Sequence, residues 1–218
     1  MEKVKMSKRQ ILLYALSIIY VIVTYAFIFI SYFVSSLNVP NNLISVQNNM
    51  TLFFLFLPII MCIINYIVIF KIGKKEDSNI LLNCSILIKY ALIPFFIIGY
   101  LLVLMFLLFT FIPVPIMIFV GPSMAIFLSM LGWIILIGSA PFSITYIIKA
   151  NKEKKHGKVL SIIAIILQFF FALDVLSIMF LTLKEKRWKK LTYTVLALLI
   201  ILVLLGIIGL NVLIFSYI

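Results

Sequence analysis

The chain has 218 residues, of which 66% are apolar and 11% are charged. A soluble domain is about 45–50% apolar and about 25% charged, and a globule of this size has too little interior to bury the excess. These proportions exclude a soluble enzyme, a disordered chain and a disulfide-framework protein. They predict an all-α polytopic membrane helix bundle that forms a single membrane domain.

Eighteen Lys and Arg against six Asp and Glu give a net charge of +12. The basic residues stand in short clusters between apolar runs, a pattern typical of cytoplasmic membrane loops rather than of a nucleic-acid-binding surface. We expect these loops to contact anionic lipid head groups and no nucleic acid. Cys62 and Cys84 lie within or beside apolar segments, which predicts two reduced thiols rather than a disulfide or a metal site.

Six apolar runs are long enough to cross a bilayer core, which requires about 20 residues for about 30 Å. They are expected to span near residues 11–34, 51–70, 90–112, 124–148, 159–183 and 191–215. The first run follows a basic N-terminal segment, but it is too long for the apolar region of a signal peptide. We therefore expect an uncleaved first helix.

The basic residues alternate between loops as the positive-inside rule requires for the first four runs. Four basic residues precede residue 11 and three lie in residues 71–79, whereas residues 37–50 and 113–123 contain none. This alternation predicts a cytoplasmic N-terminus.

The fifth run, 159–183, breaks the rule because five basic residues lie at each of its ends, in residues 149–158 and 184–190. The second of these loops also holds one acid, so its net charge is +4. Moving such a loop outward against about 100 mV costs roughly 9 kcal/mol, which favours a re-entrant or tilted fifth run and five spans. A re-entrant turn must satisfy its backbone within the membrane and usually uses Gly or Pro, and this run has neither. We expect six spans, and five spans with a re-entrant segment remain the alternative.

Asp174 is the only acid inside an apolar run. A charged side chain there costs several kcal/mol unless it is paired or neutral, which makes Asp174 a candidate functional residue. Gln168 lies one to two turns before it and Ser177 three residues after it, so the three residues form a candidate intramembrane polar site. One interpretation is a proton- or cation-coupled site; a helix–helix hydrogen bond is the other, and the one we expect. Lys89 is the obvious partner, but we expect it to snorkel to the head groups from the cytoplasmic end of its run.

Small residues recur on one face of the run 124–148 at steps of four, three, seven and four residues. This stripe predicts close helix packing, and two glycines of the last run predict a second contact. The predicted packing residues are Ala125, Ser129, Gly132, Ser139, Ser143, Gly206 and Gly209.

Motifs for enzymatic chemistry are missing from the sequence. His156 is the only histidine, and its place in a basic loop predicts a solvated side chain. There is no His-Glu-x-x-His motif, no pair of intramembrane aspartates, no intramembrane His beside a Ser or Cys, and no phosphate-binding Gly-Lys-Ser/Thr loop. We expect no enzyme activity, no cofactor and no metal.

Three segments resemble small multi-pass membrane proteins of AT-rich Gram-positive bacteria. They are Leu92-Ile-Pro-Phe-Phe, Ile112-Pro-Val-Pro and Leu167-Gln-Phe-Phe-Phe-Ala-Leu-Asp-Val-Leu-Ser177. The resemblance covers roughly the C-terminal two thirds of the chain, implies a bacterial cytoplasmic membrane, and implies no particular chemistry.

The sequence therefore predicts a non-enzymatic membrane protein that works through a protein partner or as a homo-oligomer. It would serve as a subunit or accessory of a transport, export or peptide-immunity system. The alternative is a small autonomous carrier or channel that uses the region of Asp174 and Gln168.

Overall fold

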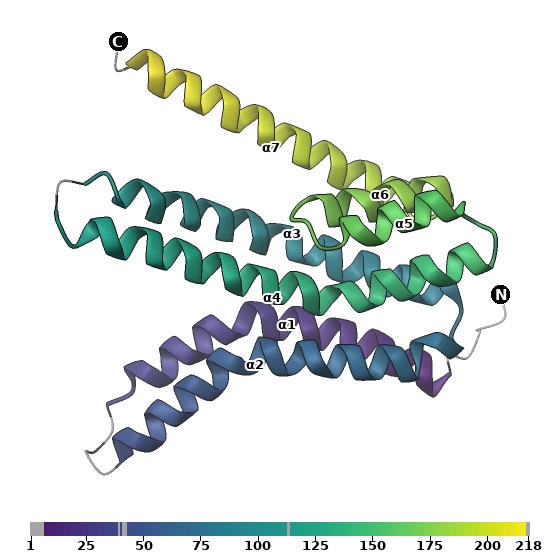
Figure 1. Ribbon diagram of the computed structural model, residues 1–218, viewed down its shortest axis with the longest axis horizontal. Coiled ribbons are helices and arrows are strands. Elements are labelled where there is room, and N and C mark those ends of the chain that lie inside the picture. The colour runs from purple at the N-terminus through teal and green to yellow at the C-terminus, as the bar shows by residue number, and fades with distance from the viewer. Residues whose placement is uncertain (1–6, 39, 41–42, 113, 217–218) are drawn as a thin grey trace.

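A computed structural model describes residues 7–38, 40, 43–112 and 114–216, and the side chains of residues 205, 207 and 209–216 lie outside this description. Throughout the described part the regular elements are helices, so the predicted all-α class is confirmed. In chain order they are α1 (Lys8–Ser36), α2 (Ile44–Lys71), the short 3₁₀ helix η2 (Gly73–Lys75), α3 (Ser78–Phe109), α4 (Met117–Lys152), α5 (Lys158–Leu167), α6 (Leu173–Lys184) and α7 (Lys189–Ser216) (Figure 1).

In the described residues, α1 to α4 are long and apolar enough to cross a membrane. They contain the first, second and fourth predicted runs and extend beyond them, whereas the third predicted run, 90–112, passes the end of α3 at Phe109 by three residues. The largest extension is in α3, which begins at Ser78 instead of near Tyr90. The polar residues between Ser78 and Lys89 are helical as well, because the helix provides hydrogen-bond partners for their backbone N–H and C=O groups. The sixth predicted run coincides with α7, which has 28 residues.

The helices pack closely at the end of the bundle where the chain begins. Every buried residue of α3 lies between Ser78 and Leu92, and α2 has no buried residue before Pro58. Tyr20 and Phe142 are among the largest fully buried side chains. Most of the core of the described residues thus lies in this half of the molecule.

Two polar side chains tie this core to α4 near Pro141. The Tyr20 hydroxyl donates to the Ile135 carbonyl at 2.5 Å, and Asn65 Nδ2 donates to the Gly138 carbonyl at 2.9 Å. A Cβ on Gly138 would lie 2.5 Å from the Tyr20 hydroxyl. Glycine at this position therefore allows α1 to approach α4.

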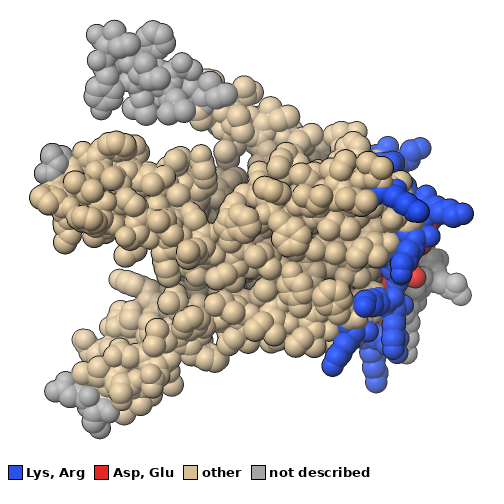
Figure 2. Space-filling model, in the orientation of Figure 1, with Lys and Arg blue, Asp and Glu red and all other residues tan. Residues whose placement is uncertain are grey.

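Toward the other end the molecule divides into three arms. One is the pair α1 and α2, the second is the pair α3 and α4, and the third is α7, as Figure 1 shows. The space-filling view shows open gaps between these arms (Figure 2). In the described residues, α7 contacts mainly α6. At the base of α7, the Tyr90 hydroxyl of α3 donates a hydrogen bond to Thr192.

The fifth predicted run is two short helices rather than one. α5 has 10 residues and α6 has 12. At 1.5 Å per residue they are about 15 Å and about 18 Å long, which is roughly half of a bilayer core each. They form an antiparallel hairpin, the α5–α6 hairpin, whose two ends both lie at the end of the molecule where the Lys and Arg side chains gather (Figures 1 and 2).

The turn of the hairpin satisfies most of its own backbone without Gly or Pro. The N–H groups of Gln168, Phe169 and Phe170 each donate to the carbonyl three residues earlier. Ala172 has φ 63° and ψ −39°, and the Leu173 N–H donates to the Phe171 carbonyl at 2.8 Å, which closes a γ-turn. This turn normally favours glycine. Alanine is the smallest side chain that can replace it, which is why the sequence pattern concealed the break.

Lys and Arg side chains gather at a single end of the molecule in the face shown by Figure 2. This end holds the beginning of α1, the two ends of the hairpin and the start of α7 (Figure 1). The loops on both sides of the fifth run therefore lie at the same end, as the charge pattern favours and a single spanning helix would not permit.

Candidate functional site

A buried ion pair joins the tip of the hairpin to α3. Lys89 Nζ lies 2.6 Å from Asp174 Oδ2, and the two side chains are each 1% exposed. The expectation that Lys89 snorkels to the head groups is wrong. Its amine points into the bundle because an acid at matching depth neutralises it there.

The matching depth follows from the positions of the two residues in their helices. Asp174 lies ten residues before Lys184 at the basic end of α6, and Lys89 lies eleven residues after Ser78 at the start of α3. Both distances correspond to about 15–17 Å along a helix, half of a bilayer core.

Polar residues of three helices extend the site. Lys89 Nζ also donates to Ser139 Oγ on α4 at 2.9 Å. At the hairpin turn, Gln168 Nε2 donates to Ser177 Oγ at 2.6 Å, and Ser177 Oγ donates to the Asp174 carbonyl at 2.9 Å. The structure thus brings together all four residues of the predicted polar site and adds Ser139, which the sequence analysis assigned only to packing.

Three buried oxygen atoms of this region have no hydrogen-bond partner in the structure. They are Asp174 Oδ1, Gln168 Oε1 and Ser143 Oγ. Buried acceptors are rarely left unpaired, so each is able to accept a hydrogen bond from a further donor such as a water molecule. Chemically, the site has one cation, one anion and spare acceptor capacity.

Aromatic side chains fix the turn of the hairpin against α3 and α4. The Phe171 ring packs edge-to-face on Phe96 and on Trp133, with centroids 5.7 Å and 5.6 Å apart. A Cβ on Gly132 would lie 3.3 Å from Phe171, so this small residue provides the seat for the ring. The predicted contact at Gly132 is thus made with the hairpin.

The other predicted packing residues have different surroundings. Ala125, Ser139 and Ser143 are buried. Ser129 is half-buried and donates to the Ala125 carbonyl of its own helix at 2.8 Å. A Cβ on Gly206 would meet nothing within 4 Å, so α7 makes no contact there. Gly209 belongs to α7 in the part whose side-chain surroundings lie outside the described residues.

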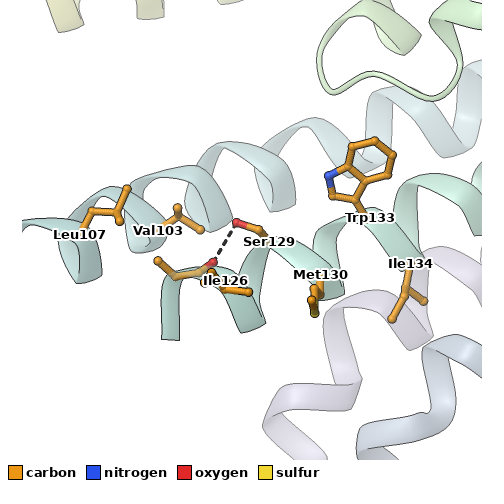
Figure 3. A pocket seen from close by; sticks show the side chains of 8 residues that line it. Val103, Leu107, Ile126, Ser129, Met130, Trp133 and Ile134 are labelled. Atoms are coloured by element: carbon orange, nitrogen blue, oxygen red, sulfur yellow. Dashed lines mark hydrogen bonds between the residues drawn. The ribbon is translucent and has the colours of Figure 1, made fainter. Parts of the chain in front are cut away.

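An open apolar groove runs between α3 and α4 in the arm that they form (Figure 3). Its volume is about 570 Å³, and its lining residues include Ala125 and Ser129. Trp133 stands at the end nearer the hairpin. The groove does not include the ion pair.

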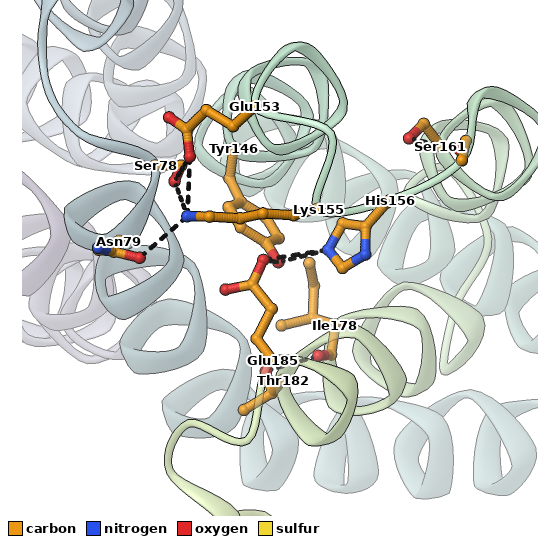
Figure 4. A network of polar contacts seen from close by, with 11 residues as sticks. Ser78, Asn79, Tyr146, Glu153, Lys155, His156, Ser161, Ile178, Thr182 and Glu185 are labelled. Atoms are coloured by element: carbon orange, nitrogen blue, oxygen red, sulfur yellow. Dashed lines mark hydrogen bonds and ion pairs between the residues drawn. The ribbon is translucent and has the colours of Figure 1, made fainter.

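A second polar cluster holds the base of the hairpin. The Tyr146 hydroxyl donates to Glu185 Oε1 at 2.8 Å, and His156 Nε2 lies 3.1 Å from the same oxygen and 3.2 Å from the hydroxyl (Figure 4). His156 is 4% exposed, so the prediction of a solvated loop residue is wrong. Burial lowers the pKa of His156, while the neighbouring Glu185 carboxylate opposes this effect. The loop folds back onto α4, which a pattern of basic residues does not reveal.

Beside this cluster, Glu153 contacts Lys155 and Ser78. Lys155 Nζ lies 2.8 Å from Glu153 Oε2, and the Ser78 hydroxyl donates to the same oxygen at 2.6 Å. These hydrogen bonds, chiefly that from Lys155, lower the pKa of Glu153. Among the described residues, no group of three His, Cys, Asp or Glu side chains is placed to hold a metal ion.

The chain belongs to a family of unknown function (DUF6652), which matches residues 7–187. The match includes α1 to α6 and with them the ion pair and the cluster at the hairpin base, whereas α7 begins just after it. Comparisons with curated proteins and with solved structures find no match.

Proposed function

We propose that this protein resides in a bacterial cytoplasmic membrane with a cytoplasmic N-terminus and that it crosses the membrane five times. The spans are α1, α2, α3, α4 and α7, and the α5–α6 hairpin enters from the cytoplasmic side and returns. The half-length of both hairpin helices supports this topology. So does the position of the basic loops, whose lysines and arginines contact anionic lipid head groups.

We further propose that the protein is a non-enzymatic subunit or accessory of a transport, export or peptide-immunity system. The observation that carries this proposal is the division of the outer half into three arms with gaps between them (Figure 2). Membrane helices associate through close packing of their surfaces, and these arms lack such packing with one another. Transmembrane helices of a partner protein fill the gaps in the working complex.

The experiment is site-specific photo-crosslinking in the native host, followed by gentle purification and mass spectrometry. Probes replace Met130 in the α3–α4 groove and Leu202 on α7, and a control probe replaces Ile18, which is exposed on the packed half. We expect one membrane protein to be crosslinked at Met130 and Leu202 and not at Ile18. Crosslinks to lipid alone at all three positions, together with purification of the chain by itself, contradict the proposal. A second copy of this chain as the captured protein identifies a homo-oligomer.

A second candidate function is a small autonomous carrier or channel. It is favoured by the unpaired buried oxygens of Asp174 and Gln168 beside an ion pair at mid-depth, since intramembrane charges commonly mark ion or proton pathways. This candidate predicts proton or solute flux in liposomes that contain only this protein, and loss of that flux in Asp174→Asn when equal amounts of folded protein are reconstituted. Liposomes without flux exclude it and leave the ion pair with a structural role.

A further inference from the structure

The two ends of the hairpin meet at one tyrosine. His156 precedes α5 and Glu185 follows α6, and Tyr146 of α4 contacts both (Figure 4). The chain segments that enter and leave the hairpin are therefore joined to each other and to α4 by a single cluster. The same entering loop is also held to α3, because Lys155 Nζ donates to Ser78 Oγ and to Asn79 Oδ1 at 3.2 Å. At the tip, the ion pair attaches the hairpin to α3.

The hydrogen atoms available to this cluster determine the state of His156. Tyr146 has one hydroxyl hydrogen, and it is donated to Glu185. The hydroxyl oxygen can then only accept from His156, so its hydrogen bond with Nε2 at 3.2 Å requires the hydrogen on Nε2. Neutral His156 therefore carries its proton on Nε2, and Nδ1 is a bare acceptor. Nδ1 is buried and has no partner.

We infer that Tyr146, His156 and Glu185 form a pH-sensitive latch that closes the cytoplasmic base of the hairpin when His156 is neutral and opens it when His156 is protonated. The added proton binds Nδ1, and the resulting N–H has no acceptor within its buried site. Water supplies the acceptor only if residues 153–157 move away from α4. The inference goes beyond the proposed function and does not depend on a partner.

The charges around His156 act in opposite directions. Glu185 from the end of α6 stabilises an imidazolium, whereas Lys184 from the same end and Lys155 from its own loop destabilise it. Two further charged side chains act on Tyr146. They are the positive Arg187 and the negative Glu153. Burial is the largest effect, so the pKa of His156 lies below its ordinary value of 6.5 in the folded protein. The free energy by which neutral His156 favours the closed latch is therefore fully present above pH 6.5. It is lost as the pH falls through the lowered pKa of His156.

The single histidine of the chain allows a direct test by NMR. The full chain, purified with a histidine-free tag and labelled with ¹⁵N-histidine, is titrated in lipid nanodiscs. We expect an Nε2–H tautomer at neutral pH and a midpoint below 6.5. A midpoint at or above that value, or an Nδ1–H tautomer, overturns the inference.

Hydrogen exchange on the same sample tests the opening itself. Between about pH 7.5 and about pH 5, we expect the protection of residues 153–161, corrected for intrinsic rates, to fall several-fold. His156→Gln keeps a donor near the position of Nε2 but does not titrate, so its protection should stay constant over this range. Equal pH dependence in this variant, or constant protection in the unmodified protein, contradicts the latch.

Discussion

Removal of either partner of the Lys89–Asp174 pair should destabilise the protein strongly. At 1% exposure, the remaining charge in Lys89→Met or Asp174→Leu has neither water nor a counter-ion. Breaking a buried pair in this way costs about 3–5 kcal/mol. The double variant Lys89→Met/Asp174→Leu leaves no charge behind and should recover most of this loss, since apolar replacement of a whole buried pair is often neutral.

The assay is reversible unfolding in mixed detergent micelles, followed by tryptophan fluorescence. Trp133 contacts Phe171 at the hairpin tip and reports on this region directly. The expected coupling free energy between the two substitutions exceeds about 3 kcal/mol, well above the ~0.6 kcal/mol average of interhelical hydrogen bonds in membranes. Additive effects, or single variants within about 1 kcal/mol of the unmodified protein, refute the pairing.

Three glycine or alanine positions give further predictions in the same unfolding assay. Ala172→Gly should raise the free energy of unfolding by about 1 kcal/mol because it relieves the positive φ, and Ala172→Val should lower it. Gly121→Ala should lower it by about 1–3 kcal/mol, since the new Cβ would lie 2.6 Å from the Phe106 carbonyl oxygen where α3 meets α4. Gly206→Ala is the matched control on α7, and it should cause no loss because its Cβ would meet nothing within 4 Å. A loss at Gly206 equal to that at Gly121 would show that α7 is packed.

The helix content of this fold follows from the apolar runs, because the length and hydropathy of a membrane helix are local properties. The all-α class and the approximate positions of α1 to α4 were therefore predictable. The α5–α6 hairpin was less predictable. The charge pattern favoured a segment 159–183 that enters the membrane and returns to the same side, but the turn uses Ala172 where a glycine was expected. The γ-turn at Ala172 is stabilised by tertiary contacts, among them the packing of Phe171 against Trp133 of α4. Such contacts cannot be predicted from the local sequence.

The candidate site was predictable in its members but not in its pairing. Asp174 and Lys89 are separated by 85 residues, and no local pattern couples them. The sequence nevertheless contains a signal for the pairing, since each of the two residues lies ten or eleven residues from the basic end of its own helix. Comparing the depths of Lys89 and Asp174 along their helices predicts that they meet, whereas the distance of Lys89 to the nearest loop does not. His156 offered no comparable signal, because its burial depends on how the loop folds against Tyr146.

The hairpin that turns back within the membrane is the central claim, and the side on which α7 ends tests it most directly. Green fluorescent protein and alkaline phosphatase are fused in turn after Ile218, with fusions after Lys190 as the cytoplasmic control. Five spans predict active phosphatase and dark fluorescent protein after Ile218, and the reverse after Lys190. Fluorescence after Ile218 places the C-terminus in the cytoplasm, which, with the proposed cytoplasmic N-terminus, requires an even number of spans and contradicts the re-entrant hairpin.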